Sequence, residues 1–270
     1  MKKIVFLDVD GTLIEPVIGM HQPHPNNVDA LRKAQANGIK IVAATGRELH
    51  SIRHVIDFPF DACVTANGSI VYADDQLIFQ GGFTSEEMVF LWNTLERLGA
   101  GFIFQGGTAY YYNDTMDPYV AKYVERMLAR GEKLIQTRPE AIPVTITKST
   151  TFFHSKAMKD EAIAQLGSRY RLMFYNAPVR AGQDDRLSGD ISNIRDTKGS
   201  GIRQVLAYYA IDPKDGIAFG DNSNDIDMFE IVDGYAVANA TDDLKTCAKA
   251  VIGDVQSDAI AQTMNKLRMI

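Results

Sequence analysis

The most constraining feature of the sequence is a four-residue apolar run, Ile-Val-Phe-Leu at residues 4–7, that ends directly in acidic residues. Asp8 follows the run at once, and Asp10, Gly11 and Thr12 come next. A short, wholly apolar run predicts a strand that is buried on both faces, as in a parallel sheet. Ligands of such sheets bind just beyond the carboxyl ends of the strands, so we expect Asp8 to border a site. The alternative is an ordinary strand that ends in an Asp-Gly turn.

Two carboxylates at this spacing suit one kind of chemistry. Asp8 and Asp10 can share one Mg²⁺ ion and one phosphate group, and Gly11 lets the backbone turn and approach a ligand closely. Like charges this close push the two pKa values apart, so that one carboxylate stays ionised as a nucleophile while the other holds a proton. The segment therefore indicates phosphoryl transfer.

A second apolar run, residues 39–44, ends in Thr45, Gly46 and Arg47. A threonine hydroxyl and the backbone N–H groups of such a turn can hold phosphate oxygens without adding charge. Thr-Gly after a strand is also ordinary turn chemistry, so this segment by itself is a weak signal.

Lys198 stands at the head of a predicted helix, because Ile202, Val205, Leu206 and Tyr209 recur at helical spacing after it. A lysine at this place can neutralise an incoming phosphate and lower the repulsion that an attacking carboxylate meets. The alternative is a solvated lysine in a loop that starts a helix.

A third apolar run begins at Gly216 and ends in a cluster of acidic and amide residues at 220–225. Asp221 and Asp225 offer the hard oxygen atoms that Mg²⁺ prefers as ligands or as partners of its ligands. An EF-hand calcium loop is excluded, because its sixth position would be Ile226 instead of glycine and its twelfth Val232 instead of glutamate.

Taken together, these segments resemble the motifs of the haloacid dehalogenase-like phosphatase superfamily in their order along the chain. Residues 8–12 match its D-x-D-G-T motif, and residues 220–225 match its G-D-x-x-N-D motif. Residues 66–68 (Ala-Asn-Gly) and 236–240 (Ala-Val-Ala-Asn-Ala) add a narrower resemblance to the Cof-type sugar-phosphatase group. The motifs lie towards the two ends of the chain, and the middle matches little.

The resemblance implies a role for each matching residue. Asp8 is expected to attack phosphorus and form an aspartyl-phosphate, and Asp10 to act as general acid and then as general base. The implied cofactor is Mg²⁺, held by the Asp8 carboxylate, the Asp10 backbone carbonyl and Asp221. Asp225 would orient Lys198 or a metal-bound water, and Arg47 would reach the substrate or pin the cap with a salt bridge. The implied phosphate ligands are Thr45, Gly46, Lys198, Asn224 and the backbone N–H groups of Val9 and Asp10.

The fold expected from these patterns is α/β, with a Rossmann-like parallel-sheet core and an inserted α+β cap domain. We assign residues 1–81 and 187–270 to the core and 82–186 to a cap that closes over the sheet and sets substrate specificity, with a polar linker at 183–186. The expected strands of the core are 4–8, 39–44, 62–65, 216–220, 234–237 and 249–252, with a hairpin at 69–79 and helices at 26–37 and 48–56. In the cap we expect helices at 85–98, 117–129 and 156–166, and strands at 101–105, 109–112, 144–153 and 170–175.

Composition narrows the possible partners. The 34 acidic and 28 basic residues give a net charge of −6, which argues against a general binder of nucleic acid or of membrane surfaces. Cys63 and Cys247 are far apart and indicate no disulfide framework, and no signal peptide or membrane-spanning run is recognised, so a cytoplasmic protein is expected. The expected partner is a small phosphorylated metabolite, and the oligomeric state stays open.

Three functions remain compatible with the sequence. The first is a Mg²⁺-dependent phosphatase that acts on sugar phosphates or similar small phosphomonoesters. The second is a phosphotransferase that resembles phosphomannomutase, which shares the D-x-D-G-T start and a comparable cap. The third is a catalytically silent sensor of a phosphorylated ligand, and the presence of both Asp8 and Asp10 argues against it, because binding alone does not need the second aspartate.

Overall fold

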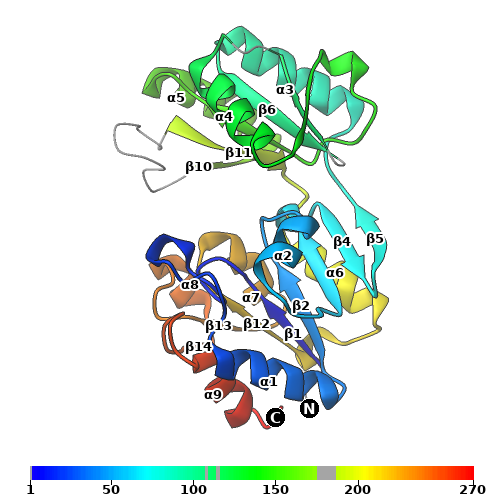
Figure 1. Ribbon diagram of the computed structural model, residues 1–270, viewed down its shortest axis with the longest axis vertical. Coiled ribbons are helices and arrows are strands. Elements are labelled where there is room, and N and C mark those ends of the chain that lie inside the picture. Colours follow the sequence, from blue (N-terminus) through cyan, green and yellow to red (C-terminus); the bar gives the residue numbers. More distant parts are fainter. Residues whose placement is uncertain (1, 107–108, 114–115, 175–186) are drawn as a thin grey trace. The chain divides into compact units, whose positions relative to one another are not determined.

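The computed structural model describes residues 2–106, 109–113, 116–174 and 187–270. The chain divides into two compact units, a larger one of Met1–Gln80 and Asp196–Ile270 and a smaller one of Gly81–Arg195. The smaller unit is thus an insertion in the larger one, and each unit is described by itself below (Figure 1).

An eight-stranded sheet forms the centre of the larger unit, in the order β14-β13-β12-β1-β2-β3-β4-β5. The strands from β14 to β3 run parallel, and β4 and β5 continue the sheet as an antiparallel hairpin. The central position of β1 and β12 means that both strands are covered on their two faces, as their apolar sequences predict. The strands are β1 (Ile4–Leu7), β2 (Lys40–Ala44), β3 (Ala62–Thr65), β4 (Ile70–Ala73), β5 (Gln76–Gln80), β12 (Gly216–Gly220), β13 (Asp233–Ala236) and β14 (Ala250–Val251).

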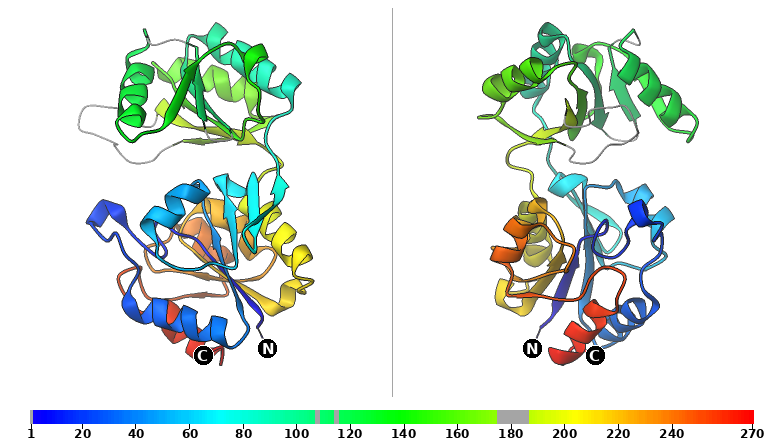
Figure 2. Two further views of the ribbon diagram at one scale, coloured as in Figure 1. Left: turned by 45° about the vertical axis from the view of Figure 1, so that its right-hand side comes forward. Right: turned by 90° about the vertical axis from the view of Figure 1, so that its left-hand side faces the viewer.

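Two layers of helices cover this sheet. On one face α1 (Pro25–Ala36), α2 (Leu49–Val55) and α9 (Ala259–Lys266) pack against a core cluster that contains Val5 and Leu7. On the other face α6 (Lys198–Tyr208), α7 (Ile226–Phe229) and α8 (Asp242–Cys247) pack against a cluster that contains Ile4 and Phe6. Both layers are visible on either side of the sheet in the right-hand view of Figure 2. Each of these four β1 side chains is fully buried, which stabilises the fold by about 1.5–3 kcal/mol per side chain.

The smaller unit contains a six-stranded sheet in the order β10-β11-β9-β6-β7-β8. All neighbours are antiparallel except β7 and β8, which run parallel. Its strands are β6 (Gly101–Gly106), β7 (Ala109–Tyr112), β8 (Lys133–Gln136), β9 (Lys148–Phe152), β10 (Tyr170–Phe174) and β11 (Ser188–Asn193).

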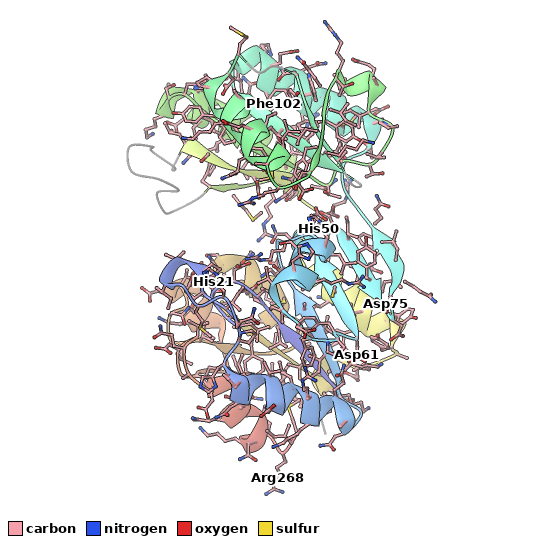
Figure 3. All side chains as sticks on the ribbon, in the orientation of Figure 1. His21, His50, Asp61, Asp75, Phe102 and Arg268 are labelled. Carbon is pink, nitrogen blue, oxygen red and sulfur yellow. The ribbon has the colours of Figure 1, made fainter. Side chains whose placement is uncertain are left out.

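Three helices accompany this second sheet. α3 (Ser85–Leu98) and α5 (Lys156–Leu166) contribute to one core cluster, in which the Trp92 ring meets the rings of Phe102 and Phe104 edge-on at 4.9 and 5.1 Å. α4 (Pro118–Leu128) packs on the opposite face, against Ile103. Phe102 is labelled in Figure 3. The smaller unit therefore has a hydrophobic core of its own.

The α/β fold class is confirmed, and most expected elements are present within one or two residues. One boundary was wrong: residues 187–195 were assigned to the core, but β11 pairs with β9 and β10 in the sheet of the smaller unit. The sequence of β11, Ser-Gly-Asp-Ile-Ser-Asn, contains a single apolar side chain, so it lacks the alternation that predicts a strand. β8 was missed as well, and the strand expected at 144–153 is limited to β9.

The predicted linker at 183–186 lies outside the described residues. Among the helices that are described, none combines the length and the apolar character that crossing a membrane requires.

Candidate active site

The central strands β1 and β12 bring two of the predicted acidic residues together. The strands are parallel and in register, with Leu7 opposite Phe219, and the N–H group of Asp8 continues the pairing by donating to the Phe219 carbonyl at 3.0 Å. Asp8 and Asp221 therefore emerge side by side at the carboxyl ends of their strands, where open α/β sheets bind ligands. The Asp8 residue is only 5% exposed.

Lys198 connects the two acidic motifs. Its ammonium group donates to Asp8 Oδ1 at 2.5 Å and to Asp225 Oδ1 at 2.6 Å. The lysine is the first residue of α6, and Thr197 and Ser200 fix the start of that helix through a reciprocal capping box. Sequence reasoning placed Lys198 near an attacking carboxylate, and the structure places it in direct contact with Asp8.

Asp225 is fully buried and supports both its neighbours and the loop after β12. One of its oxygens accepts from Lys198, while the other accepts from the backbone N–H groups of Asp221 and Asn222 at 2.9 and 3.1 Å. The contact with Lys198 matches one of the two roles expected for Asp225. Gly220 is required beside it, because a Cβ atom there would lie 2.6 Å from Asp225 Oδ2.

The electrostatics of this cluster are unusual. Burial raises the pKa of Asp8 to about 8 and that of Asp225 to about 6, although Lys198 acts in the opposite direction on both. Burial also raises the pKa of Asp221. Burial disfavours the charge on Lys198, but Asp225 and Asp8 outweigh it and raise the pKa of the lysine above its usual value. The site thus holds three carboxyl groups around one ammonium group.

This surplus of carboxyl groups over ammonium groups fits a cation, which would favour the ionised form of each carboxyl group. Ligand atoms of Asp8, Asp221 and Asp225 all lie within 4.8 Å of one another. Carboxylate oxygens are the donors that Mg²⁺ prefers, and a divalent ion would compensate the charge that Lys198 leaves unbalanced. Because both Asp225 oxygens already accept hydrogen bonds, Asp8 and Asp221 are the better candidates for direct ligands.

The backbone around the first motif is shaped for close approach. Gly11 has a φ of +89°, and a Cβ atom at this residue would lie 2.2 Å from Asp221 Oδ2, so a larger residue does not fit. The Thr12 hydroxyl donates to Asp221 Oδ1 at 3.2 Å, and the Asn239 side-chain amide donates to the Gly11 carbonyl at 2.8 Å. Val9 buries its side chain completely, so its contribution to the site is its main chain.

A second loop places hydrogen-bonding groups after β2. The buried Thr45 hydroxyl accepts the N–H of Arg47 at 3.1 Å, which leaves its own hydrogen available for a phosphate oxygen. Gly46 faces the side chain of Asn67, whose amide would lie 3.2 Å from a Cβ atom at this glycine. Asn224, a predicted phosphate ligand, donates to Asn67 Oδ1 at 3.2 Å.

Asn67, which contacts both Gly46 and Asn224 in this region, is a residue that sequence reasoning did not assign to the site. It belongs to the Ala-Asn-Gly segment after β3, which had entered only as a match to the Cof-type group. Its φ of 54° is left-handed, a conformation that asparagine tolerates better than most residues. An asparagine between an alanine and a glycine at a strand end was therefore the available signal.

Asp10 and Arg47 form an ion pair that is partly exposed to solvent. The Arg47 guanidinium donates from Nε to Asp10 Oδ2 and from Nη2 to Asp10 Oδ1, both at 2.6 Å. The Asp10 side chain is 44% exposed and that of Arg47 25%. Neither of the two roles expected for Arg47 described this contact, which lies within the larger unit.

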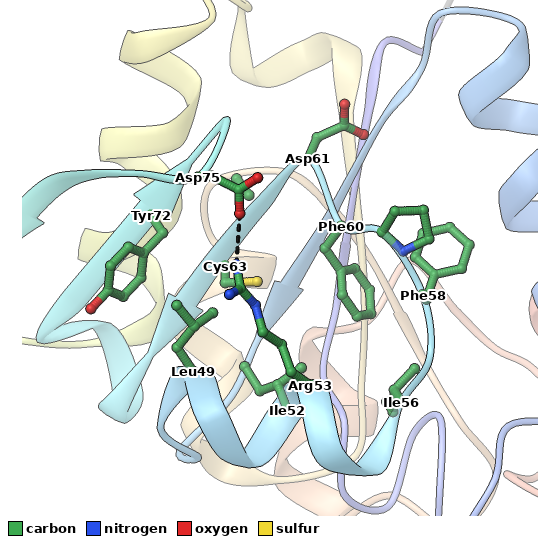
Figure 4. A pocket seen from close by; sticks show the side chains of 12 residues that line it. Leu49, Ile52, Arg53, Ile56, Phe58, Phe60, Asp61, Cys63, Tyr72 and Asp75 are labelled. Atoms are coloured by element: carbon green, nitrogen blue, oxygen red, sulfur yellow. Dashed lines mark hydrogen bonds and ion pairs between the residues drawn. The ribbon is translucent and has the colours of Figure 1, made fainter. Parts of the chain in front are cut away.

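A separate pocket lies between α2 and the strands β3 and β4 (Figure 4). Its volume is about 140 Å³, and an ion pair of Arg53 and Asp75 at 2.6 Å crosses it. Burial raises the pKa of the Cys63 thiol in its wall to about 12, so this cysteine is a poor nucleophile. None of the predicted site residues lines the pocket, which is therefore distinct from the acidic cluster.

Comparisons with known proteins agree with this geometry. Residues 5–264 match the haloacid dehalogenase-like hydrolase family. The pyridoxal phosphate phosphatase YbhA of Escherichia coli is 23% identical over 273 residues, which cover 96% of this chain and 96% of that protein. The phosphatase BT1666 of Bacteroides thetaiotaomicron has the same fold, with a TM-score of 0.82 at 22% identity over 100% of this chain and 96% of that one. The sugar phosphatase BT4131 does so with a TM-score of 0.75 at 24% identity, over 99% and 100%.

These matches confirm the predicted family resemblance and the predicted activity class, that of a phosphoric monoester hydrolase. The chain belongs to the haloacid dehalogenase-like hydrolase family.

Proposed function

We propose that this phosphatase is Mg²⁺-dependent and hydrolyses small phosphomonoesters, such as sugar phosphates, through an aspartyl-phosphate on Asp8. The observation that carries the proposal is the buried Lys198 ammonium group held between Asp8 and Asp225 at the ends of the central strands. Burying such a cluster is costly, and buried charged groups with specific charged partners are concentrated at functional sites.

In the first step Asp8 attacks phosphorus and the ester oxygen leaves. Lys198 lowers the repulsion between the carboxylate and the anionic phosphoryl group. The Thr45 hydroxyl, the Gly46 N–H and the Asn224 amide are the groups we assign to the phosphoryl oxygens. They donate hydrogen bonds without adding charge, so they can hold the phosphoryl group as its charge is redistributed.

Asp10 serves both halves of the reaction. As a general acid it gives a proton to the leaving oxygen, and as a general base it then takes a proton from the water that hydrolyses the aspartyl-phosphate. Its 44% exposed side chain is compatible with a group that must meet substrate and water in turn.

Asp8 and Asp221 are the carboxylates that would hold Mg²⁺, together with the backbone carbonyl of Asp10. When bound, the ion supplies positive charge next to the phosphoryl oxygens. Asp225 then has a positioning role, because it fixes Lys198 and the loop that carries Asp221.

The substrate class rests on similarity. One relative is named a pyridoxal phosphate phosphatase and one structural neighbour a sugar phosphatase, so both names point to small phosphorylated compounds. We assign the smaller unit, Gly81–Arg195, to substrate specificity, as expected of a cap.

A phosphate-release screen tests the proposal. The protein is incubated with a panel of sugar phosphates and pyridoxal phosphate, with Mg²⁺ or with EDTA, and both inorganic phosphate and sugar-phosphate isomers are measured. Release of phosphate that depends on Mg²⁺ is the expected result. Exchange of phosphate between positions of a sugar would instead identify a phosphotransferase, absence of both a sensor, and release that EDTA leaves unchanged would contradict the role of Asp221.

A further inference from the structure

The Asp10 carboxylate is held by a bidentate pair of hydrogen bonds from Arg47. Both of its oxygens accept from one guanidinium group, Nε to Oδ2 and Nη2 to Oδ1, and the two distances are equal at 2.6 Å. Paired bonds of this kind fix the plane of a carboxylate as well as its position, which a single contact does not. An aspartate that is 44% exposed would otherwise be able to take several rotamers.

Arg47 is itself fixed from several sides. Its N–H donates to the Thr45 hydroxyl at 3.1 Å, and its carbonyl accepts the N–H of Ala66 at 3.0 Å, so its main chain is tied to the ends of β2 and β3. Its remaining guanidinium nitrogen, Nη1, donates to the Ser51 hydroxyl on α2 at 3.1 Å. Ile52, the next residue of α2, is 1% exposed and anchors that helix in the core.

From this geometry we propose that Arg47 is a positioning residue, which aims the Asp10 carboxylate for proton transfer to the leaving oxygen. The inference rests on the proposed function, in which Asp10 is the general acid and base. Proton transfer requires a heavy-atom distance of about 2.6–3.2 Å, so the direction of the carboxylate decides its efficiency. One of the two bonds to Arg47 opens when Asp10 engages the ester oxygen, while the other keeps the side chain in place.

This role predicts that the rate loss depends on the leaving group of the substrate. Esters with a poor leaving group, such as alkyl phosphates, need a proton on the departing oxygen, whereas aryl phosphates with an acidic phenol need it much less. A residue that acts through the general acid therefore affects the two classes unequally. An arginine that bound the phosphoryl group directly, or that merely supported the fold, would affect both classes alike.

The test compares kcat/KM for an alkyl phosphate and for p-nitrophenyl phosphate in Arg47→Gln, Arg47→Lys, Asp10→Asn and the double variant Asp10→Asn/Arg47→Gln. The constant kcat/KM reports the steps up to formation of the aspartyl-phosphate and so includes departure of the leaving group. For Arg47→Gln we expect a loss of about 10²-fold with the alkyl phosphate and less than about 10-fold with the aryl phosphate. Arg47→Lys keeps the positive charge but cannot make the paired hydrogen bonds. Its kcat/KM for the alkyl phosphate is expected to lie between those of wild type and Arg47→Gln.

The double variant provides the decisive comparison. If Arg47 acts through Asp10, adding Arg47→Gln to Asp10→Asn lowers the alkyl rate by less than about threefold. Equal losses with both substrates, or a full further loss in the double variant, would overturn the role of Arg47 while leaving the proposed function intact. A loss in Asp10→Asn that is the same for both substrates would instead overturn the acid role of Asp10, and the inference with it.

Arg53→Gln is the matched control. Arg53 lies on α2 and also pairs with an aspartate at 2.6 Å, but its partner Asp75 is 86% exposed and belongs to the turn between β4 and β5. This variant is expected to leave both kcat/KM values within about twofold of wild type. Circular dichroism and thermal melting of every variant separate a kinetic effect from a loss of fold.

Discussion

Each of the two units buries a lysine–aspartate ion pair, and the surroundings of the two pairs differ. In the larger unit the Lys198–Asp8 distance is 2.5 Å, with side chains 1% and 7% exposed. In the smaller unit the Lys148–Asp190 distance is 3.1 Å, with side chains 15% and 11% exposed. Lys198 also contacts a second carboxylate, that of Asp225, and Asp190 also accepts from the neutral hydroxyl of Thr150 at 2.9 Å.

The difference separates a reactive cluster from a structural one. Around Lys198 burial raises the pKa values of the carboxyl groups, and these groups outnumber the ammonium group, so the cluster suits an added cation. Asp190 accepts from Lys148 and from the hydroxyl of Thr150, and these contacts join β11 to β9 within the sheet of the smaller unit. Burial of an ion pair is thus not by itself a sign of catalysis. What distinguishes the Lys198 site is its acidic cluster at the carboxyl ends of two central parallel strands.

The largest difference between the two sites is expected when both aspartates are replaced in the same manner. Asp8→Asn removes the proposed nucleophile and is expected to lower kcat by about 10⁴-fold or more with the fold retained. Asp190→Asn is expected to keep kcat for p-nitrophenyl phosphate within about threefold, because it changes a contact inside the other sheet. Steady-state kinetics measure kcat of each variant relative to wild type. Turnover by Asp8→Asn at nearly the wild-type rate would refute the assignment of Asp8 as the nucleophile.

The lysines give the second comparison, in stability. Lys198→Met leaves Asp8 and Asp225 buried without their partner, and removing one member of a buried ion pair costs about 3–5 kcal/mol. Lys148→Met removes one partner of a carboxylate that keeps its hydrogen bond from Thr150 and is partly exposed to solvent, so we expect a smaller loss of about 1–2 kcal/mol. Urea denaturation followed by circular dichroism compares the two variants with wild type. A larger loss for Lys148→Met would show that the burial of the two pairs had been ranked in the wrong order.

Added metal is expected to affect the two sites differently. If Mg²⁺ binds at Asp8 and Asp221, a concentration of about 100 times Kd stabilises the folded protein by about 2.7 kcal/mol, and EDTA reverses the effect. Asp221→Asn is expected to lose this stabilisation, whereas Asp190→Asn keeps it. Thermal melting with and without Mg²⁺ tests both variants, and equal stabilisation of Asp221→Asn would place the ion elsewhere.

The two ion pairs also show which structural features could be predicted from the sequence alone. The strands β1 and β12 are wholly apolar and end in acids, so local pattern sufficed to predict both the parallel sheet and the position of Asp8 at its edge. The Lys148–Asp190 pair was not predicted, because its members are 42 residues apart and lie on polar strands, one of which was missed. Contacts of this kind depend on which strands become neighbours, and no local spacing encodes that.

The same reason explains what was missed around Asp10. Arg47 was identified from its position after Thr-Gly, but its partner is 37 residues earlier in the chain, on the loop after a neighbouring strand. Two loops that follow adjacent parallel strands lie at the same sheet edge, so their proximity was predictable. The direction of the Arg47 side chain was not predictable. It depends on the contact of its guanidinium group with Ser51 and on the contact of its backbone N–H with Thr45.

A partly exposed ion-pair group is expected to contribute the smallest stabilisation of the three sites compared. Asp233, at the start of β13, accepts from Lys2 and Lys249 at 2.8 Å each, and its side chain is 34% exposed. Partial burial acts against the charge, but the hydrogen bonds from the two lysines lower the pKa of Asp233 below its usual value. A carboxylate whose pKa is lower in the folded than in the unfolded protein stabilises the fold above the unfolded value of about 4, and the contribution is lost as the pH falls through the folded value.

Because solvent screens this group, its contribution at pH 7 is about 0.5–1 kcal/mol, well below that of either buried pair. The free energies of unfolding of wild type and Asp233→Asn, measured by urea denaturation at pH 7, are expected to differ by this amount, and the difference should shrink as the pH is lowered below 4. High salt should reduce it at pH 7 as well, since exposed pairs are screened. A difference that stayed constant from pH 7 to pH 3 would mean that Asp233 contributes through packing and not through its charge.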